Sequence, residues 1–218
     1  MSNDTLSIFW FRQDLRLADN PALSRALDRP NVMVIYILDE VNPGDFKMGG
    51  ASRWWLHHSL AALNDSLQQK LMVFEGDPET VLAALVAQFP ITHIFWNRCF
   101  EPWQIARDTL IKKRFSDEGI QVKSDNQSLL AQPWSLLKSD GTPYKIFTPY
   151  WRQLESKLSE APLTGLAAPC DATLSKRVHS LPHNQLEAIE FYRKELSDLK
   201  LLPQRSWADN FSDHATPG

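Results

Sequence analysis

The protein has 218 residues, of which 43% are hydrophobic and 22% charged, and its formal net charge is −3. This length suits one sizeable α/β domain with an appendage, and no apolar run approaches the roughly 20 residues that cross a bilayer. The acidic balance lacks the positive field typical of nucleic-acid binders, so these residues are expected to supply few contacts to DNA.

The N-terminus and the cysteines favour a cytoplasmic protein. Met1 is followed by Ser, Asn and Asp, which is unlike a secretory signal or an Arg-rich transit peptide. Cys99 and Cys170 are far apart and belong to no CxxC or Cys/His cluster, which argues against a disulfide framework and a metal site. We expect a cytoplasmic monomer with reduced thiols, no metal and no membrane span.

Five short runs rich in β-forming residues alternate with helical segments. The runs are residues 7–11, 32–38, 71–75, 92–96 and 119–123. Between them, apolar residues recur at helical spacing, as at Leu56, Leu60, Leu63 and Leu67. The alternation predicts an α/β domain in residues 1–130, with a Rossmann-like, doubly wound sheet of five parallel strands.

Three of the expected helices begin in the same way, with a polar residue followed by proline. The pairs are Asn20-Pro21, Asp77-Pro78 and Glu101-Pro102. Proline lacks a backbone N–H, which costs nothing at the first helical position because that N–H has no partner within the helix. The preceding side chain can accept hydrogen bonds from the free amides of the first turn, although Glu is a poorer cap than Asn or Asp. Ser52 is expected to cap the helix after the second strand.

Beyond about residue 130 the alternation stops, and prolines separate shorter helical pieces such as residues 187–199. We interpret residues 131–218 as an irregular and partly helical connector. A connector of this length rarely exists without a further domain to connect.

Four blocks of the sequence resemble the photolyase and cryptochrome family. They are FWFRQDLRLADNPAL at residues 9–23, ASRWWLHHSLAAL at 51–63, FWNRCFEPWQIARD at 95–108 and PYKIFTPYWR at 143–152. A fainter match at residues 201–218 is similar to the connector that precedes the family's helical domain. The resemblance therefore covers nearly the whole chain.

The resemblance implies the N-terminal portion of a light-dependent DNA-repair flavoprotein, a carbon–carbon lyase that splits UV-induced pyrimidine dimers with an electron from photoexcited FAD. The FAD is expected in a C-terminal helical domain, and the Ser/Thr-Ser-Arg-Leu-Ser block that binds its phosphates does not occur here. These residues alone are therefore expected to be inactive and to hold no catalytic residue. The expected partners are that helical domain and, through it, damaged DNA.

The resemblance also implies the strand order 3-2-1-4-5, with a light-harvesting antenna chromophore bound where the order reverses. The loops at residues 12–19, 39–50 and 97–103 would meet there and offer aromatic, sulfur and charged groups to a flat conjugated ring. The expected antenna-binding residues are Arg12, Asp39, Phe46, Met48, Arg53, Cys99, Phe100, Glu101 and Trp103. The alternative is that Arg53 and Glu101 form an ordinary ion pair and that the aromatic residues only pack.

Members of the family use a folate, a deazaflavin or, in a few cases, a flavin as antenna, and the type expected here stays open between a folate and a deazaflavin. Arg53 matches a position that contacts the chromophore in deazaflavin-type members, yet Cys99 stands where that type tends to carry an acidic residue. Trp103-Gln104 replaces an Asn-Glu pair of the enterobacterial folate type.

Two other motifs have both a structural and a functional interpretation. Arg12, Asp14 and Arg16 either bridge to the helical domain or form a solvated charge network on a loop. Lys145 and Phe147 belong to an aromatic strap that would contact the same domain.

Two rival functions remain. A cryptochrome, a blue-light receptor on the same scaffold, differs from a repair enzyme in sequence outside these residues. A nucleotide-binding α/β module needs a glycine-rich phosphate loop, whereas residues 97–103 contain no glycine and neither G-x-G-x-x-G nor G-x-x-x-x-G-K-[ST] occurs.

Overall fold

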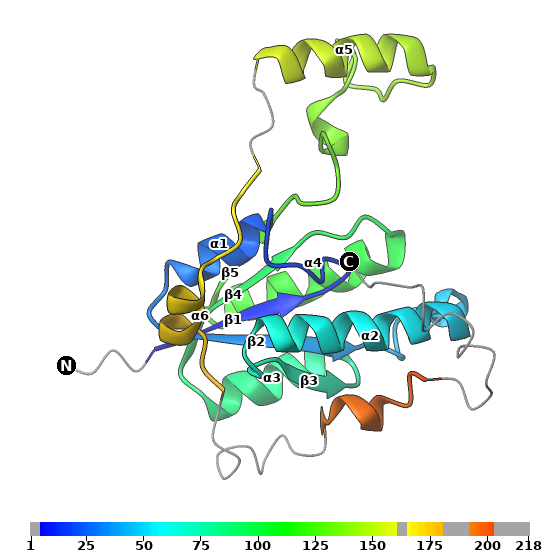
Figure 1. Ribbon diagram of the computed structural model, residues 1–218. Coiled ribbons are helices and arrows are strands. Elements are labelled where there is room, and N and C mark those ends of the chain that lie inside the picture. The colour runs from blue at the N-terminus through cyan, green and yellow to red at the C-terminus, as the bar shows by residue number, and fades with distance from the viewer. Residues whose placement is uncertain (1–4, 161–164, 181–191, 203–218) are drawn as a thin grey trace.

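The computed structural model describes residues 5–160, 165–180 and 192–202, and its centre is a six-stranded sheet (Figure 1). The strands are β1 (Leu6–Phe11), β2 (Val32–Leu38), β3 (Met72–Glu75), β4 (Ile91–Asn97), β5 (Gln121–Asp125) and β6 (Arg193–Lys194). Their order is β5-β4-β1-β2-β3-β6. The sheet confirms the strand prediction and the order, with its reversal at β1.

The edge strand β6 corrects the expectation of five strands. It pairs antiparallel with β3, and the Glu75 amide donates to the Tyr192 carbonyl over 2.8 Å. The expected helix at 187–199 is therefore wrong for Arg193–Lys194, and Leu196–Leu199 forms a short 3-10 helix, η5; residues 187–191 lie outside the described residues. Pairing satisfies backbone groups that would otherwise stay open along the edge of β3.

Helices cover both faces of the sheet, as the doubly wound fold requires (Figure 1). One core cluster joins β1 and β2 to α1 (Pro21–Leu27), α2 (Gly50–Ser66) and α6 (Asp171–Arg177). The other joins the sheet to α3 (Pro78–Gln88) and α4 (Pro102–Asp117). Every residue of β1 and β2 is buried, which is typical of parallel strands covered on both faces.

The helix starts follow the sequence closely, with one exception. Asn20 Oδ1 accepts from the Leu23 amide over 3.0 Å, and Asp77 Oδ2 accepts from the Thr80 amide over 3.1 Å. Glu101 occupies the cap position of α4 without a capping bond. Ser52 does not cap α2, which begins at Gly50 with Gly49 as its cap, because the extended backbone of Gly49 lets the helix start earlier.

The segment after β5 forms an arm, residues 133–160, that extends away from the sheet (Figure 1). It contains the 3-10 helix η2 (Pro133–Ser135) and α5 (Phe147–Glu160), so part of the expected strap is helical. The chain then returns to the domain, where Leu174 and Val178 are buried. None of the described helices is both long and apolar enough to span a bilayer.

Candidate functional site

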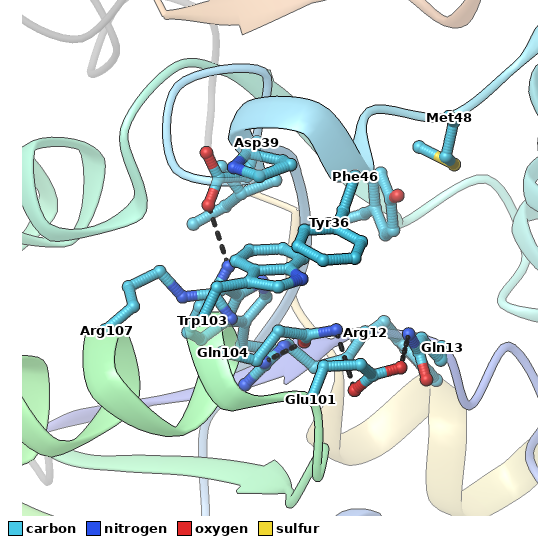
Figure 2. Close-up of a pocket in the computed structure, with 14 residues that line it drawn as sticks. Arg12, Gln13, Tyr36, Asp39, Phe46, Met48, Glu101, Trp103, Gln104 and Arg107 are labelled. Atoms are coloured by element: carbon cyan, nitrogen blue, oxygen red, sulfur yellow. Dashed lines mark hydrogen bonds and ion pairs between the residues drawn. The ribbon is translucent and has the colours of Figure 1, made fainter.

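A pocket of about 340 Å³ opens at the carboxyl ends of β1 and β2, beside the start of α4 (Figure 2). The strand order reverses at β1, which is where open α/β sheets usually bind ligands. The walls come from two strand ends, the loop after β2 and the first turns of α4. The lining residues are Trp10, Phe11, Arg12, Gln13, Tyr36, Ile37, Asp39, Pro43, Phe46, Met48, Glu101, Trp103, Gln104 and Arg107.

The structure brings six of the nine expected antenna-binding residues to this pocket. They are Arg12, Asp39, Phe46, Met48, Glu101 and Trp103. The three loops therefore do converge, as their positions after neighbouring strands predicted.

The other three expected residues do not line the pocket. Arg53 pairs with Glu40, in the loop after β2, and this ion pair holds its guanidinium away from the pocket. Cys99 is buried in the protein, and burial raises the pKa of its thiol. The Phe100 ring lies 6.4 Å from the ring of Trp134, at the base of the arm.

One interpretation of the sequence predicted an ion pair between Glu101 and Arg53, but Arg53 pairs with Glu40 instead. The two carboxylate oxygens of Glu101 accept from Gln13 Nε2 over 2.9 Å and from Gln104 Nε2 over 3.0 Å. Each oxygen keeps further lone pairs, so the carboxylate can still accept a bond from a ligand.

Arg12 forms part of the pocket floor, and both terminal nitrogens of its guanidinium donate to protein groups. Nη1 donates to Asp108 Oδ2 over 2.8 Å and Nη2 donates to Gln104 Oε1 over 2.6 Å. The guanidinium carbon lies 4.4 Å from the centre of the Trp10 ring. Such charge-assisted bonds and the cation–π contact fix the arginine in place.

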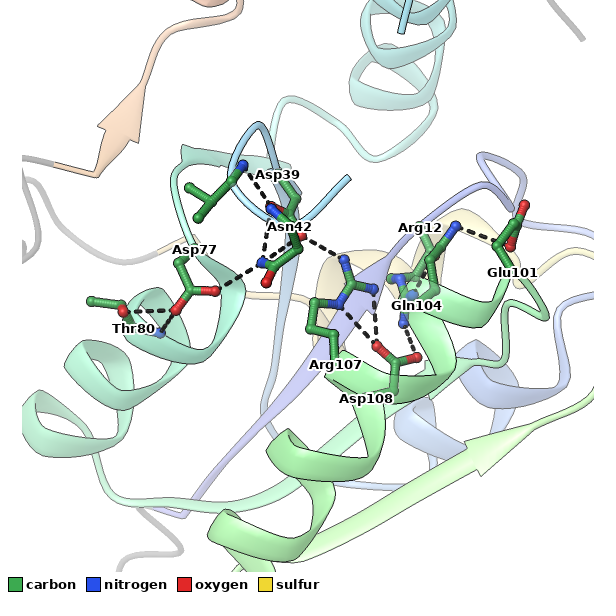
Figure 3. A network of polar contacts seen from close by, with 10 residues as sticks. Arg12, Asp39, Asn42, Asp77, Thr80, Glu101, Gln104, Arg107 and Asp108 are labelled. Atoms are coloured by element: carbon green, nitrogen blue, oxygen red, sulfur yellow. Dashed lines mark hydrogen bonds and ion pairs between the residues drawn. The ribbon is translucent and has the colours of Figure 1, made fainter. Parts of the chain in front are cut away.

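Arg107 completes the floor and lies at the centre of a buried polar network (Figure 3). Its Nη1 donates to Asp39 Oδ2 over 2.7 Å and its Nη2 donates to Asp108 Oδ1 over 2.9 Å. Its guanidinium carbon is 5.1 Å from the ring centres of both Trp10 and Trp103. The side chain of Asn42 extends the network by donating to Asp39 and to Asp77 Oδ1. The floor is therefore rigid and its charges are paired.

Apolar side chains form the walls above this floor. Phe46 lies in a three-residue 3-10 helix, η1 (Gly44–Phe46), and remains 76% exposed. Met48 and Trp103 lie close by on the pocket wall (Figure 2). An exposed aromatic residue beside a cavity is a common feature of ligand sites, so the pocket offers apolar faces above a polar base.

The FRQDLR motif supports the loop beneath the pocket. The Asp14 carboxylate accepts from the Arg12 amide over 2.8 Å and from the Asn97 side chain, and burial raises its pKa. Arg16 is the solvated member and pairs with Asp19 over 3.2 Å. The interpretation as a solvated network is therefore wrong for Arg12 and Asp14, because both are buried within this domain.

Eight of the fourteen lining residues were not among those predicted from the sequence, and Gln104, Arg107 and Tyr36 are three of them. Gln104 and Arg107 follow Trp103 on α4, and the spacing of four residues between Trp103 and Arg107 places them one turn apart on one side of the helix. That spacing could have identified Arg107. Tyr36 lies within a continuous apolar strand, and no sequence pattern separates it from core residues.

Comparisons with known proteins agree with the resemblance. A family model described as DNA photolyase matches residues 7–169. A deoxyribodipyrimidine photo-lyase of Agrobacterium fabrum is 38% identical over 217 residues, and the match covers 97% of this chain and 42% of that protein. Cryptochrome-2 of Arabidopsis thaliana is 32% identical over 157 residues, with 70% of this chain and 26% of that protein covered.

Solved structures give the same assignment. A bacterial class III photolyase from Agrobacterium tumefaciens matches with a TM-score of 0.84 and 36% identity, over 100% of this chain and 43% of that one. A photolyase from Sulfolobus tokodaii, solved with two FAD molecules, matches with a TM-score of 0.64 and 26% identity, over 81% of this chain and 38% of that one. The chain spans about two fifths of the length of these photolyases, and it belongs to the DNA photolyase family.

Proposed function

We propose that the pocket between β1, β2 and α4 binds a light-harvesting chromophore, and that the chain forms part of a light-driven enzyme that repairs pyrimidine dimers in DNA. The observation that carries the proposal is a cavity of about 340 Å³ at the reversal point of the sheet, with apolar walls above a rigid, charge-paired floor. This volume falls within the range of small-molecule sites. The photolyase from Sulfolobus tokodaii, whose two FAD molecules imply a novel light-harvesting cofactor in that protein, supports the same function.

The pocket residues suit a flat heteroaromatic ring. The apolar faces of Trp103 and Phe46 would cover the ring, and the Glu101 carboxylate would accept a bond from an N–H at its edge. Both a pterin and a deazaflavin carry such an N–H, so the folate and deazaflavin types both fit. When bound, the chromophore would absorb light and pass the excitation on to a flavin.

We propose that residues outside this chain bind the flavin and make most contacts to the DNA. We propose that FAD binds in a helical domain of a longer protein, that this domain makes most contacts to damaged DNA, and that it packs near the arm. The whole protein would act in the cytoplasm. The 218 residues alone would not retain FAD and would not split pyrimidine dimers under light; stoichiometric FAD in the purified chain, or light-dependent repair by it, would contradict this.

Titration with candidate chromophores tests the pocket. The purified chain is titrated with methenyltetrahydrofolate and, separately, with a deazaflavin, and binding is followed by the fluorescence of the probe. We expect saturable binding of one of the two, lost in Trp103→Ala and kept in Trp151→Ala, a matched change on the arm. Saturable binding of neither probe, or equal binding by the Trp103→Ala variant, would overturn the proposal.

A cryptochrome-type photoreceptor is the second candidate, because Cryptochrome-2 of Arabidopsis thaliana matches over 70% of the chain. The same pocket would serve an antenna in either protein. Light-dependent repair of a dimer-containing oligonucleotide by the longer protein would favour the enzyme, and light responses without repair would favour the receptor.

A further inference from the structure

Tyr36 is a polar side chain of the pocket whose hydroxyl has no protein partner in the part of the chain that the structure describes. It comes from the second half of β2 and lines the pocket (Figure 2), and the residue is 7% exposed. Within residues 5–160, 165–180 and 192–202, its hydroxyl group forms no hydrogen bond to a protein group. The other polar residues around it differ, because Arg12, Asp39, Glu101 and Arg107 each have hydrogen-bond partners.

Among the described residues, the Tyr36 hydroxyl is not one of the unpaired polar atoms that protein encloses completely, so it is open to the pocket, where a ligand can take the place of solvent. Trp10 also has an unpaired polar atom, Nε1, among the described residues, but this atom is enclosed by protein. It lies on the ring that stacks against the Arg12 guanidinium. Tyr36 is therefore the better placed of the two to meet a ligand in the pocket.

The hydroxyl of Tyr36 stays protonated over the whole physiological pH range and can therefore donate a hydrogen bond. Burial raises the pKa of Tyr36 and outweighs the nearby Arg12 guanidinium, which lowers it, while the carboxylates of Glu40 and Asp39 add to the rise. The phenol stays neutral, so it can donate one hydrogen bond and accept others.

Tyr36 and Glu101 lie on different sides of the pocket, with Arg12 and Trp103 between them in the view of Figure 2. We propose that Tyr36 determines ligand specificity, by donating a hydrogen bond to a carbonyl oxygen or ring nitrogen on the side of the ligand away from Glu101. The inference rests on the proposed chromophore site. It restricts the ligand to a heteroaromatic ring that carries a donor edge toward Glu101 and an acceptor edge toward Tyr36.

Tyr36→Phe is the direct test, because it removes the hydroxyl and keeps the ring. In the titration with methenyltetrahydrofolate or a deazaflavin, we expect the dissociation constant of the bound probe to rise about tenfold, as the loss of one hydrogen bond in a buried site implies. The matched control is Tyr150→Phe on α5, which removes a hydroxyl outside the pocket and should leave the constant unchanged. Without probe, the melting temperature of Tyr36→Phe should equal or exceed that of the wild type, because the hydroxyl has no partner to lose.

The outcomes separate the two proposals. An unchanged dissociation constant in Tyr36→Phe, with binding lost in Trp103→Ala, would overturn the role of Tyr36 and leave the chromophore site intact. A lowered melting temperature in unliganded Tyr36→Phe would also overturn it, because the effect on binding would then be structural. If no probe saturates the wild type, or if Trp103→Ala binds normally, the chromophore site itself is overturned.

Discussion

Replacing Arg107 with methionine removes the charge at the centre of the pocket floor and keeps a side chain of similar reach between Trp10 and Trp103. In the structure, the side chains of Arg107 and Asp39 are each only 6% exposed, and they are joined over 2.7 Å. The variant therefore leaves the Asp39 carboxylate buried without its cation.

The expected cost follows from that burial. Removing one partner of a buried ion pair typically destabilises a protein by about 3–5 kcal/mol. Asp39 keeps bonds from the amides of Val41 and Asn42 and from the Asn42 side chain, so we expect the lower end, about 3 kcal/mol. For a chain of this length, that corresponds to a fall in melting temperature of about 6–12 °C.

Urea unfolding followed by circular dichroism measures the free energy of unfolding of the Arg107→Met variant. The matched control is Lys113→Ala on the same helix, where the pair with Asp117 joins side chains that are 76% and 66% exposed. This control should cost under about 1 kcal/mol. Adding Asp39→Asn to Arg107→Met should recover part of the loss, because the unpaired carboxylate is then neutral.

A cost for Arg107→Met no larger than that of Lys113→Ala would refute the reasoning. It would show that the network is solvated rather than buried. The pocket floor would then not be rigid.

Three further expectations concern other parts of the chain. Burial holds the folded-state pKa of Asp14 above its ordinary value, so the wild type should lose stability relative to Asp14→Asn as the pH rises from about 4 to about 7. Urea unfolding measures this, and a difference in unfolding free energy that stays constant with pH would count against it. Cys170 is exposed and a hydrogen bond to Thr173 lowers its pKa, whereas Cys99 is buried and burial raises its pKa. Mass spectrometry should therefore find one thiol labelled by iodoacetamide in the native chain and two in the unfolded chain. Phe147→Ser removes a side chain that is 71% exposed on the arm. It should change the unfolding free energy by under about 0.5 kcal/mol and should reduce self-association measured by light scattering. A large loss of stability would show that the arm packs more tightly than its exposure indicates.

The sheet was predictable because its signals are local. Continuous apolar runs marked the parallel strands, and Asn20 and Asp77 marked helix starts. The strand β6 was not predictable, because two polar residues, Arg193–Lys194, pair through their backbone and carry no hydrophobic pattern. The cap of α2 was misplaced because Gly49, without a capping side chain, precedes Ser52.

The place of the pocket was predictable, but only part of its lining was. Loops after neighbouring parallel strands must meet at one edge of the sheet, which brought Arg12, Asp39 and Glu101 together. The partner that a side chain selects depends on three-dimensional geometry, and Arg53 pairs with Glu40 instead of facing the pocket. Tyr36 was missed because its strand is buried throughout.

Mapping a bound chromophore by nuclear magnetic resonance tests the central claim most directly. Amide and indole signals of the isotope-labelled chain are followed during titration with methenyltetrahydrofolate or a deazaflavin. The chromophore site predicts saturable shifts centred on Gln13, the Trp103 indole and the loop that carries Phe46, with the arm unaffected. Shifts centred on the groove beside Arg193 and Lys200, on the arm, or nowhere in the spectrum would contradict it.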